Sequence, residues 1–117
     1  MSERRKHLRI HTIADIEILA GGKTTKGVIT NISASGLGII ITAPIQIGER
    51  VEISFNLAKE SKFTGIKGTV VRADHISDQF YYFLGVNFQS IKEDKKAELN
   101  RFVLDKKIEH YGIKMKD

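Results

Sequence analysis

The chain has 117 residues, of which 41% are hydrophobic and 28% charged, as expected for one globular domain with a modest core. It contains no cysteine, which excludes disulfide bonds and thiolate zinc sites and is compatible with the cytoplasm. Its basic start, MSERRKHLRIHT, lacks the apolar core of a signal peptide, and no apolar run is long enough to span a bilayer. We therefore expect neither secretion nor membrane insertion.

The formal net charge of +5 is concentrated at the N-terminus. Residues 1–11 carry four Lys or Arg side chains against one Glu, a net charge of +3, whereas residues 12–91 hold seven basic and seven acidic side chains. A local basic cluster favours an anionic partner, such as a phosphate-bearing ligand, a nucleic acid or a lipid headgroup. A solvated basic tail is the plain alternative.

After this arm, the sequence predicts short strands separated by turns. The segment IADIEILA alternates apolar and polar residues, and Gly21-Gly22 after it is typical of a hairpin turn. The expected strands are 13–20, 23–32, 36–42, 50–57, 63–74 and 79–89. Six strands at a spacing of roughly ten residues indicate an all-β fold, a small antiparallel barrel or sandwich.

The final segment predicts a helix over 91–110. Ser90 followed three residues later by Glu93 has the form of a capping box, and no Gly or Pro interrupts the segment before Gly112. Its apolar residues form two sets, the first being Leu99, Phe102 and Val103 and the second Ala97, Leu104, Ile108 and Tyr111. The first set can cover the barrel. The second either packs on a partner, such as a second copy in a homodimer, or belongs to a broad core-facing surface.

The sequence lacks the residue groupings that catalysis requires. His7 and His11 are four residues apart, but their segment is basic and has no helical pattern, which disfavours a metal ion; His75 and His110 are isolated. No nucleophile elbow, Walker loop or dinucleotide fingerprint is present. We expect no enzymatic activity, no metal and no cofactor.

Two short motifs are candidates for ligand binding, and the first lies in the basic arm. Arg5 and Arg9 are four residues apart, with Arg4 and Lys6 beside them. Arginine grips phosphate with two hydrogen bonds, stacks on aromatic rings and pairs with the O6/N7 edge of guanine. Two arginines in a flexible arm can therefore close over a guanine nucleotide.

The second motif lies in the stretch TNISASGLGIII, where Asn31, Ser33 and Gly36 follow the pattern Asn-x-Ser-x-x-Gly between two predicted strands. These residue types are typical of a plain turn. They also suit a ligand, because alternate strand residues place Asn31 and Ser33 on one side, and Gly36 admits backbone N–H donors without a Cβ in the way.

Together, Arg5-x3-Arg9, Asn31-x-Ser33-x2-Gly36 and a strand pair ending in GTVVR and FLGVNF resemble the PilZ domain, over about residues 4–110. The resemblance implies a six-stranded antiparallel β-barrel of split-barrel type with a C-terminal α-helix and a flexible basic N-terminal arm. It also implies a bacterial receptor for the second messenger cyclic di-GMP. Gly68 and Gly85 match strand glycines of the family, which we interpret as bulges or close-packing sites.

The resemblance further implies how the arm acts. Arg5 and Arg9 would fold over cyclic di-GMP and bind guanine edges and phosphate, and Arg4 would add a contact. Binding would order the arm and create a signalling surface for a downstream protein partner. The protein would then be a ligand-gated adaptor.

On the barrel, the resemblance implies that Asn31, Ser33 and Gly36 lie beneath the ligand and contact a guanine base. Residue 31 is Asn where Asp is commoner in the family, so a charged acceptor for the guanine N–H groups is missing. We expect a single domain over 1–117, with the arm at 1–11, the barrel at 12–90 and the helix at 91–111.

Two other functions are compatible with this sequence. A small barrel that binds nucleic acid would suit the basic arm, but the predicted strands show no face that interleaves Lys or Arg with aromatics, and QFYYFLGVNFQ looks like a buried strand. A PilZ-like module that binds proteins and no nucleotide is the second alternative, although such modules generally lack one or both motifs.

Overall fold

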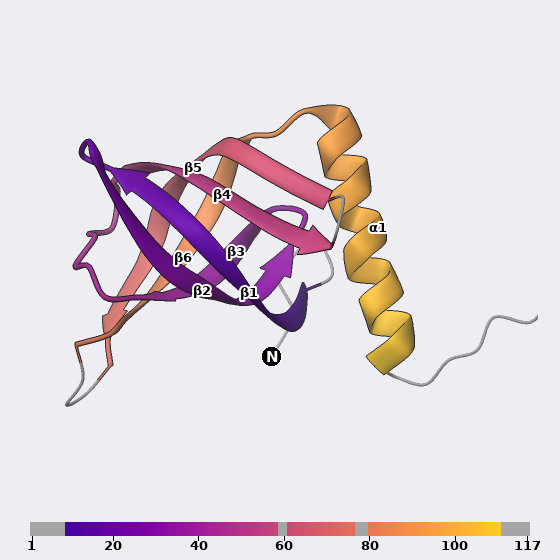
Figure 1. Ribbon diagram of the computed structural model, residues 1–117, viewed down its shortest axis with the longest axis horizontal. Coiled ribbons are helices and arrows are strands. Elements are labelled where there is room, and N and C mark those ends of the chain that lie inside the picture. The colour runs from indigo at the N-terminus through magenta and orange to yellow at the C-terminus, as the bar shows by residue number, and fades with distance from the viewer. Residues whose placement is uncertain (1–8, 59–60, 77–79, 111–117) are drawn as a thin grey trace, which may run out of the picture.

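The computed structural model describes residues 9–58, 61–76 and 80–110, which form a closed antiparallel barrel of six strands and one helix (Figure 1). The elements are β1 (Arg9–Ala20), β2 (Lys23–Ser33), β3 (Gly36–Ile41), β4 (Arg50–Ala58), β5 (Ser61–His75), β6 (Tyr82–Ser90) and α1 (Glu93–His110). Around the barrel the strands follow the order β1-β2-β3-β6-β5-β4, and β1 closes it by pairing with β4. The predicted all-β barrel with a C-terminal helix is confirmed.

Alternation along the strands builds an aliphatic core. Successive side chains of a strand point to opposite faces, so every second residue enters the barrel. The fully buried side chains include Ile16, Ile18, Ile29, Ile32, Leu37, Ile39, Ile41, Ile53, Phe63, Val70 and Leu84. Gly21 and Gly22 have positive φ angles of 58° and 80° and join Ala20 to its partner Lys23, so the predicted hairpin turn is confirmed.

The first strand begins earlier than its alternation predicts. The sequence pattern starts at Ile13, but β1 begins at Arg9 because residues 9–11 pair with the end of β2. Ile10 is buried there and extends the core, and the register then shifts between His11 and Ala14. Pairing between strands therefore overrides the local pattern at this end of the barrel.

The predicted capping box is wrong. Ser90 is the last residue of β6 and pairs with Lys67, so it cannot cap a helix that begins at Glu93. The first helical hydrogen bond instead runs from the Lys96 amide to the Lys92 carbonyl, at 2.8 Å. Two acidic residues in the first turn, Glu93 and Asp94, favour this start through the helix dipole.

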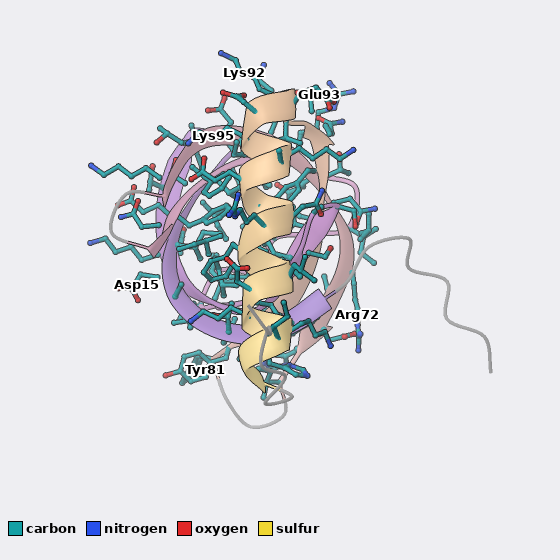
Figure 2. The ribbon with its side chains drawn as sticks, turned by 90° about the vertical axis from the view of Figure 1, so that its right-hand side faces the viewer. Asp15, Arg72, Tyr81, Lys92, Glu93 and Lys95 are labelled. Atoms are coloured by element: carbon teal, nitrogen blue, oxygen red, sulfur yellow. The ribbon has the colours of Figure 1, made fainter. Side chains whose placement is uncertain are left out.

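The helix lies across one end of the barrel, beside the end of β4 and the start of β5 (Figures 1 and 2). Leu99 and Val103 are buried in the core, which confirms the barrel-facing set. The Lys95 Nζ donates to the carbonyl of Lys62 at 2.8 Å and lies 4.9 Å from the centre of the Phe63 ring. This contact fastens the first turns of α1 to β5.

The second apolar set of the helix faces outward in part. Leu104 is 49% exposed and Ile108 is half-buried, while Tyr111 lies outside the described residues. A homodimer through this side of α1 therefore stays a prediction. Within residues 9–58, 61–76 and 80–110, no helix is long and apolar enough to cross a bilayer.

Candidate functional site

The barrel places Arg9, the last residue of the first motif, beside the second motif. In the pairing of β1 with β2, Arg9 is the direct partner of Ser33, and His11 is the partner of Asn31. The end of the first motif therefore lies on the strand next to the second motif. Arg4 and Arg5 lie outside the described residues, and Arg9 is described by its backbone alone.

The buried side chain of Ser33 stabilises the turn between β2 and β3. Its side chain is fully buried, and its Oγ lies 3.1 Å from the Ser35 Oγ. The same oxygen accepts the Ser35 N–H at 3.2 Å and donates to the Gly36 carbonyl at 3.4 Å. A Ser hydroxyl that bonds to the backbone two or three residues ahead stabilises a turn. In this structure the hydroxyl of Ser33 is engaged with the turn itself.

Gly36 lets β3 approach β6 closely. It is buried, and a Cβ at this position would overlap the carbonyl oxygen of Val86. The adjacent Ser35 carbonyl accepts the Phe88 N–H at 2.9 Å, which ties the turn to β6. The absence of a side chain at Gly36 is therefore required by strand packing, whatever the ligand requires.

Asn31 is the motif residue whose side chain reaches the outside of the barrel. It is half-buried, and its amide donates from Nδ2 to the Thr30 Oγ1 at 3.2 Å. A Cβ added to Gly38 would lie 2.5 Å from this Nδ2 and 2.9 Å from the ring of Phe83. The Asn31 amide and the Phe83 ring thus converge over the backbone of Gly38.

A row of paired residues that includes Asn31 crosses five strands. His11 pairs with Asn31, Asn31 with Gly38, Gly38 with Gly85, and Gly85 with Arg72. Two glycines, Gly38 and Gly85, occupy the middle of the row. The surface there is therefore formed by backbone and by the side chains of neighbouring residues. A Cβ on Gly85 would lie 3.1 Å from the Arg72 Cβ, which confirms that Gly85 is a close-packing position.

Arg72 occupies the far end of this row on the outer side of the barrel (Figure 2). Its Nε donates to the Asp74 carboxylate at 2.6 Å, and its guanidinium carbon lies 5.1 Å from the centre of the Phe83 ring. We call the outer surface formed by Asn31, Phe83, Gly85 and Arg72, over the buried Gly38, the motif face.

The contact between Phe83 and Arg72 joins β6 to β5, so the pattern of neither strand alone predicts it. The alternation offered a signal, because Leu84 and Val86 point inward and so place Phe83 and Gly85 outward. The register of β5 against β6, which places Arg72 beside Gly85, is absent from the sequence.

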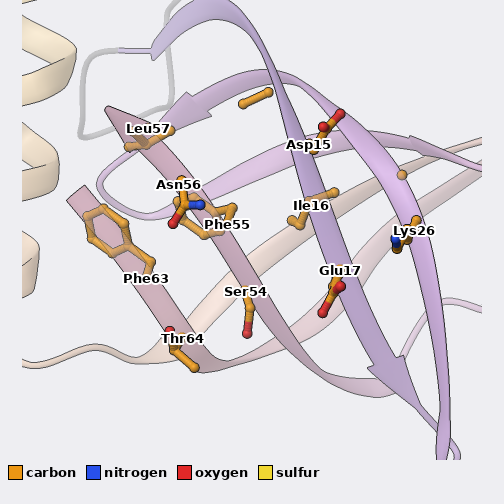
Figure 3. A pocket seen from close by; sticks show the side chains of 12 residues that line it. Asp15, Ile16, Glu17, Lys26, Ser54, Phe55, Asn56, Leu57, Phe63 and Thr64 are labelled. Carbon is orange, nitrogen blue, oxygen red and sulfur yellow. The ribbon is translucent and has the colours of Figure 1, made fainter. Parts of the chain in front are cut away.

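A groove with a volume of about 780 Å³ lies elsewhere, over β1, β2, β4 and β5 (Figure 3). We call it the acidic groove. Its lining residues are Ala14, Asp15, Ile16, Glu17, Lys26, Gly27, Ser54, Phe55, Asn56, Leu57, Phe63 and Thr64. None of the residues of the second motif lines it. In the described part of the chain, no group of three or more His, Asp or Glu residues could hold a metal ion.

Comparisons with known proteins converge on one domain type. The sequence model of the PilZ domain matches residues 3–105. A search among curated protein sequences finds no significant match.

Three solved structures resemble the fold. The inhibitor of motility MotI/DgrA from Bacillus subtilis has a TM-score of 0.80 and 17% identity, over 92% of this chain and 53% of that chain. YcgR from Escherichia coli, in complex with c-di-GMP, has a TM-score of 0.78 and 19% identity, over 94% and 49%. The MrkH–c-di-GMP complex from K. pneumonia has a TM-score of 0.77 and 20% identity, over 97% of this chain and 57% of that chain. This chain thus spans about half the length of those proteins.

Proposed function

This chain belongs to the PilZ domain family, and on that premise we propose that it is a receptor for cyclic di-GMP. The observation that carries the proposal is the pairing of Arg9 with Ser33, which puts the start of the barrel beside the β2–β3 turn. Two resembling structures, YcgR and MrkH, are complexes with c-di-GMP, which supports the same ligand.

The arm supplies the positive charge in this proposal. Cyclic di-GMP carries two phosphates and two guanines, so its receptor needs cationic groups, base-edge donors and flat groups that stack. Arg4, Arg5 and Arg9 provide forked donors that stay charged, bind phosphate with two hydrogen bonds and pair with guanine O6 and N7. Since β1 begins at Arg9, the residues before it can reach the adjacent turn.

The barrel contributes through the second motif. Asn31 offers its amide to a guanine edge at the surface, and Ser33 and Gly36 fix the turn that carries it. Turn backbone N–H groups add donors beside the base. Two of the three motif residues thus act by shaping the site.

Ligand binding, in this proposal, orders the arm and exposes a surface for a downstream protein partner. Ordering costs conformational entropy, which the contacts to phosphate and base offset. The protein acts in the cytoplasm as an adaptor without catalysis or cofactor. A homodimer through the side of α1 that carries Leu104 is part of the proposal, and light scattering of Leu104→Glu against the wild type tests it.

Isothermal titration calorimetry tests the receptor function. The full chain is titrated with cyclic di-GMP at physiological salt, with GTP and cyclic di-AMP as controls. The proposal predicts micromolar or tighter binding to cyclic di-GMP alone, and the stoichiometry reports one or two ligands per chain. No heat and no thermal-shift response from a folded protein would overturn it.

A further inference from the structure

We propose that the acidic groove is a docking site for a protein partner, which adds an extended segment of alternating apolar and basic residues as a strand between β1 and β4. The inference goes beyond the proposed receptor function, because it assigns a second site, for a peptide, on another part of the barrel.

The first argument is a split in the barrel wall beside the groove. β1 pairs with β2 from end to end, but with β4 only over residues 16–19. β4 likewise pairs with β5 from end to end, but with β1 only over residues 52–55. The two strands diverge beyond this pairing (Figure 3). Among the described residues, 9–15 of β1 and 56–58 of β4 therefore have a paired strand on one side only.

The open edges can bind a further strand. The backbone N–H and C=O groups of a strand point to its two sides, so an edge without a neighbour presents donors and acceptors in a row. An extended peptide satisfies these groups by adding a strand, with main-chain hydrogen bonds for affinity and alternate side chains for specificity. The open stretch of β1, residues 9–15, extends about 20 Å at 3.3 Å per residue, which matches a segment of about six residues.

The second argument is the alternation of side chains at the groove. Ile16 and Phe55 are buried and Leu57 is half-buried, so the side of the groove that faces the core is apolar. Asp15 and Glu17 are exposed on the outer side. Successive residues of an added strand also point to opposite faces. Every second residue of the segment would therefore lie against the apolar side, and the residues between them beside the carboxylates.

The third argument is charge. Glu17 lies opposite Lys26 in the pairing of β1 with β2, whereas Asp15 lies opposite Val28. Asp15 therefore has no cation across from it on β2. Opposite charges on neighbouring strands stabilise the pairing and like charges destabilise it. A Lys or Arg of the incoming segment is thus favoured beside Asp15, and an Asp or Glu is disfavoured.

The test titrates the isotope-labelled full chain with capped hexapeptides and follows the backbone amides by NMR. The first peptide, Val-Lys-Val-Lys-Val-Lys, has the expected alternation, and the second replaces each Lys by Glu. We expect the first to shift the amides of Asp15, Asn56 and Leu57 with a dissociation constant of about 1 mM or lower. The Glu peptide should bind about tenfold more weakly or not at all. A third peptide, with N-methylated valines, keeps the charge but loses backbone donors and should also bind weakly.

A matched pair of variants checks the role of Asp15. Asp15→Asn should weaken binding of the Val-Lys peptide about threefold, as for loss of one cross-strand charge pair. Asp105→Asn, an equal change of charge at an exposed position of α1 outside the groove lining, should leave this affinity unchanged. Equal affinities in the two variants would show that Asp15 does not select the basic residues.

Four outcomes would overturn the inference. The Val-Lys peptide could leave the groove amides in place at about 10 mM, where a dissociation constant of 1 mM predicts near-saturation. The Glu peptide or the N-methylated peptide could bind as tightly as the Val-Lys peptide. The groove amides could also shift with protein concentration alone, which would make a second copy of this chain the occupant. None of these titrations contains cyclic di-GMP, so failure of this inference leaves the receptor function intact, and failure of the receptor function leaves this inference intact.

Discussion

The motif face and the acidic groove are both outer surfaces of the barrel, and they differ in charge. The groove has a volume of about 780 Å³, and Asp15 and Glu17 line it with a single lysine, Lys26 (Figure 3). The motif face carries Arg72, which pairs with Asp74, and the strand that follows the basic arm pairs beside it. For a ligand with two phosphates, carboxylates are repulsive and arginines attractive. Charge and strand register are therefore the grounds on which we propose the motif face as the ligand site.

The strongest test of this comparison removes one arginine of the arm. Arg5→Ala should weaken cyclic di-GMP binding by about a hundredfold or more, because a forked, charged pair of hydrogen bonds to phosphate or guanine is lost. The unfolding midpoint should stay within about 1 °C of the wild type, since a surface substitution alters stability little. Lys6→Ala, with the same change of charge in the same arm, is the matched control for calorimetry. If Arg5→Ala and Lys6→Ala lose the same affinity for cyclic di-GMP, Arg5 contributes only its positive charge.

Gly36→Ala should produce the largest loss of stability. The new Cβ would overlap the carbonyl oxygen of Val86, so β3 must move away from β6, at a cost of about 3 kcal/mol. Chemical denaturation measures this directly. Gly48→Ala is a useful contrast, because its positive φ of 94° causes strain while no atom lies within 4 Å of the added Cβ. If Gly36→Ala unfolds like the wild type, Gly36 is not a packing residue.

Substitution of Asn31 should mainly weaken ligand binding, whereas substitution of Ser33 should mainly lower stability. Asn31→Ala removes a surface amide, so binding should weaken about tenfold while stability changes little. Ser33→Ala removes a buried hydroxyl that forms hydrogen bonds with three atoms of the turn. The free energy of unfolding should therefore fall by about 1–2 kcal/mol. Parallel titration and denaturation of the two variants check this division. A Ser33→Ala variant of wild-type stability would show that the turn does not depend on its hydroxyl.

The smallest effect is expected in the acidic groove. Glu17→Gln removes a carboxylate from the groove and should leave cyclic di-GMP affinity within about twofold, because Glu17 lies on β1 away from the motif face. Calorimetry of this variant beside Asn31→Ala compares the two surfaces directly. A loss of affinity as large as that of Asn31→Ala would place the ligand in the groove.

The sequence predicted the barrel well because alternation and turn residues act locally. The turn residues predict the hairpin at Gly21-Gly22, and the spacing of apolar residues predicts that Leu99 and Val103 face the barrel. Both predictions are confirmed. The capping box failed because Ser90 pairs with Lys67, a partner 23 positions away that no local pattern reveals. Non-local pairing therefore decided where strand ended and helix began.

The surroundings of the candidate site could be predicted less completely than the fold. The pattern of the motif proposes Asn31, Ser33 and Gly36 as site residues, which stays a prediction, but the burial of Ser33 and the contact of Gly36 with β6 depend on the folded turn. The pairing of Arg72 with Phe83 depends on the register of two strands and on a bulge in one of them. A single sequence contains no information about that register beyond the alternation of each strand.

The most direct test of the central claim is a titration of the isotope-labelled full chain with cyclic di-GMP, followed by backbone amide NMR. The proposal predicts that the amides of Asn31, Gly38, Gly85 and Arg72 shift together with increasing ligand, while those of Glu17 and Ser54 in the acidic groove stay in place. Shifts confined to the groove, or no shifts at saturating ligand, would contradict it.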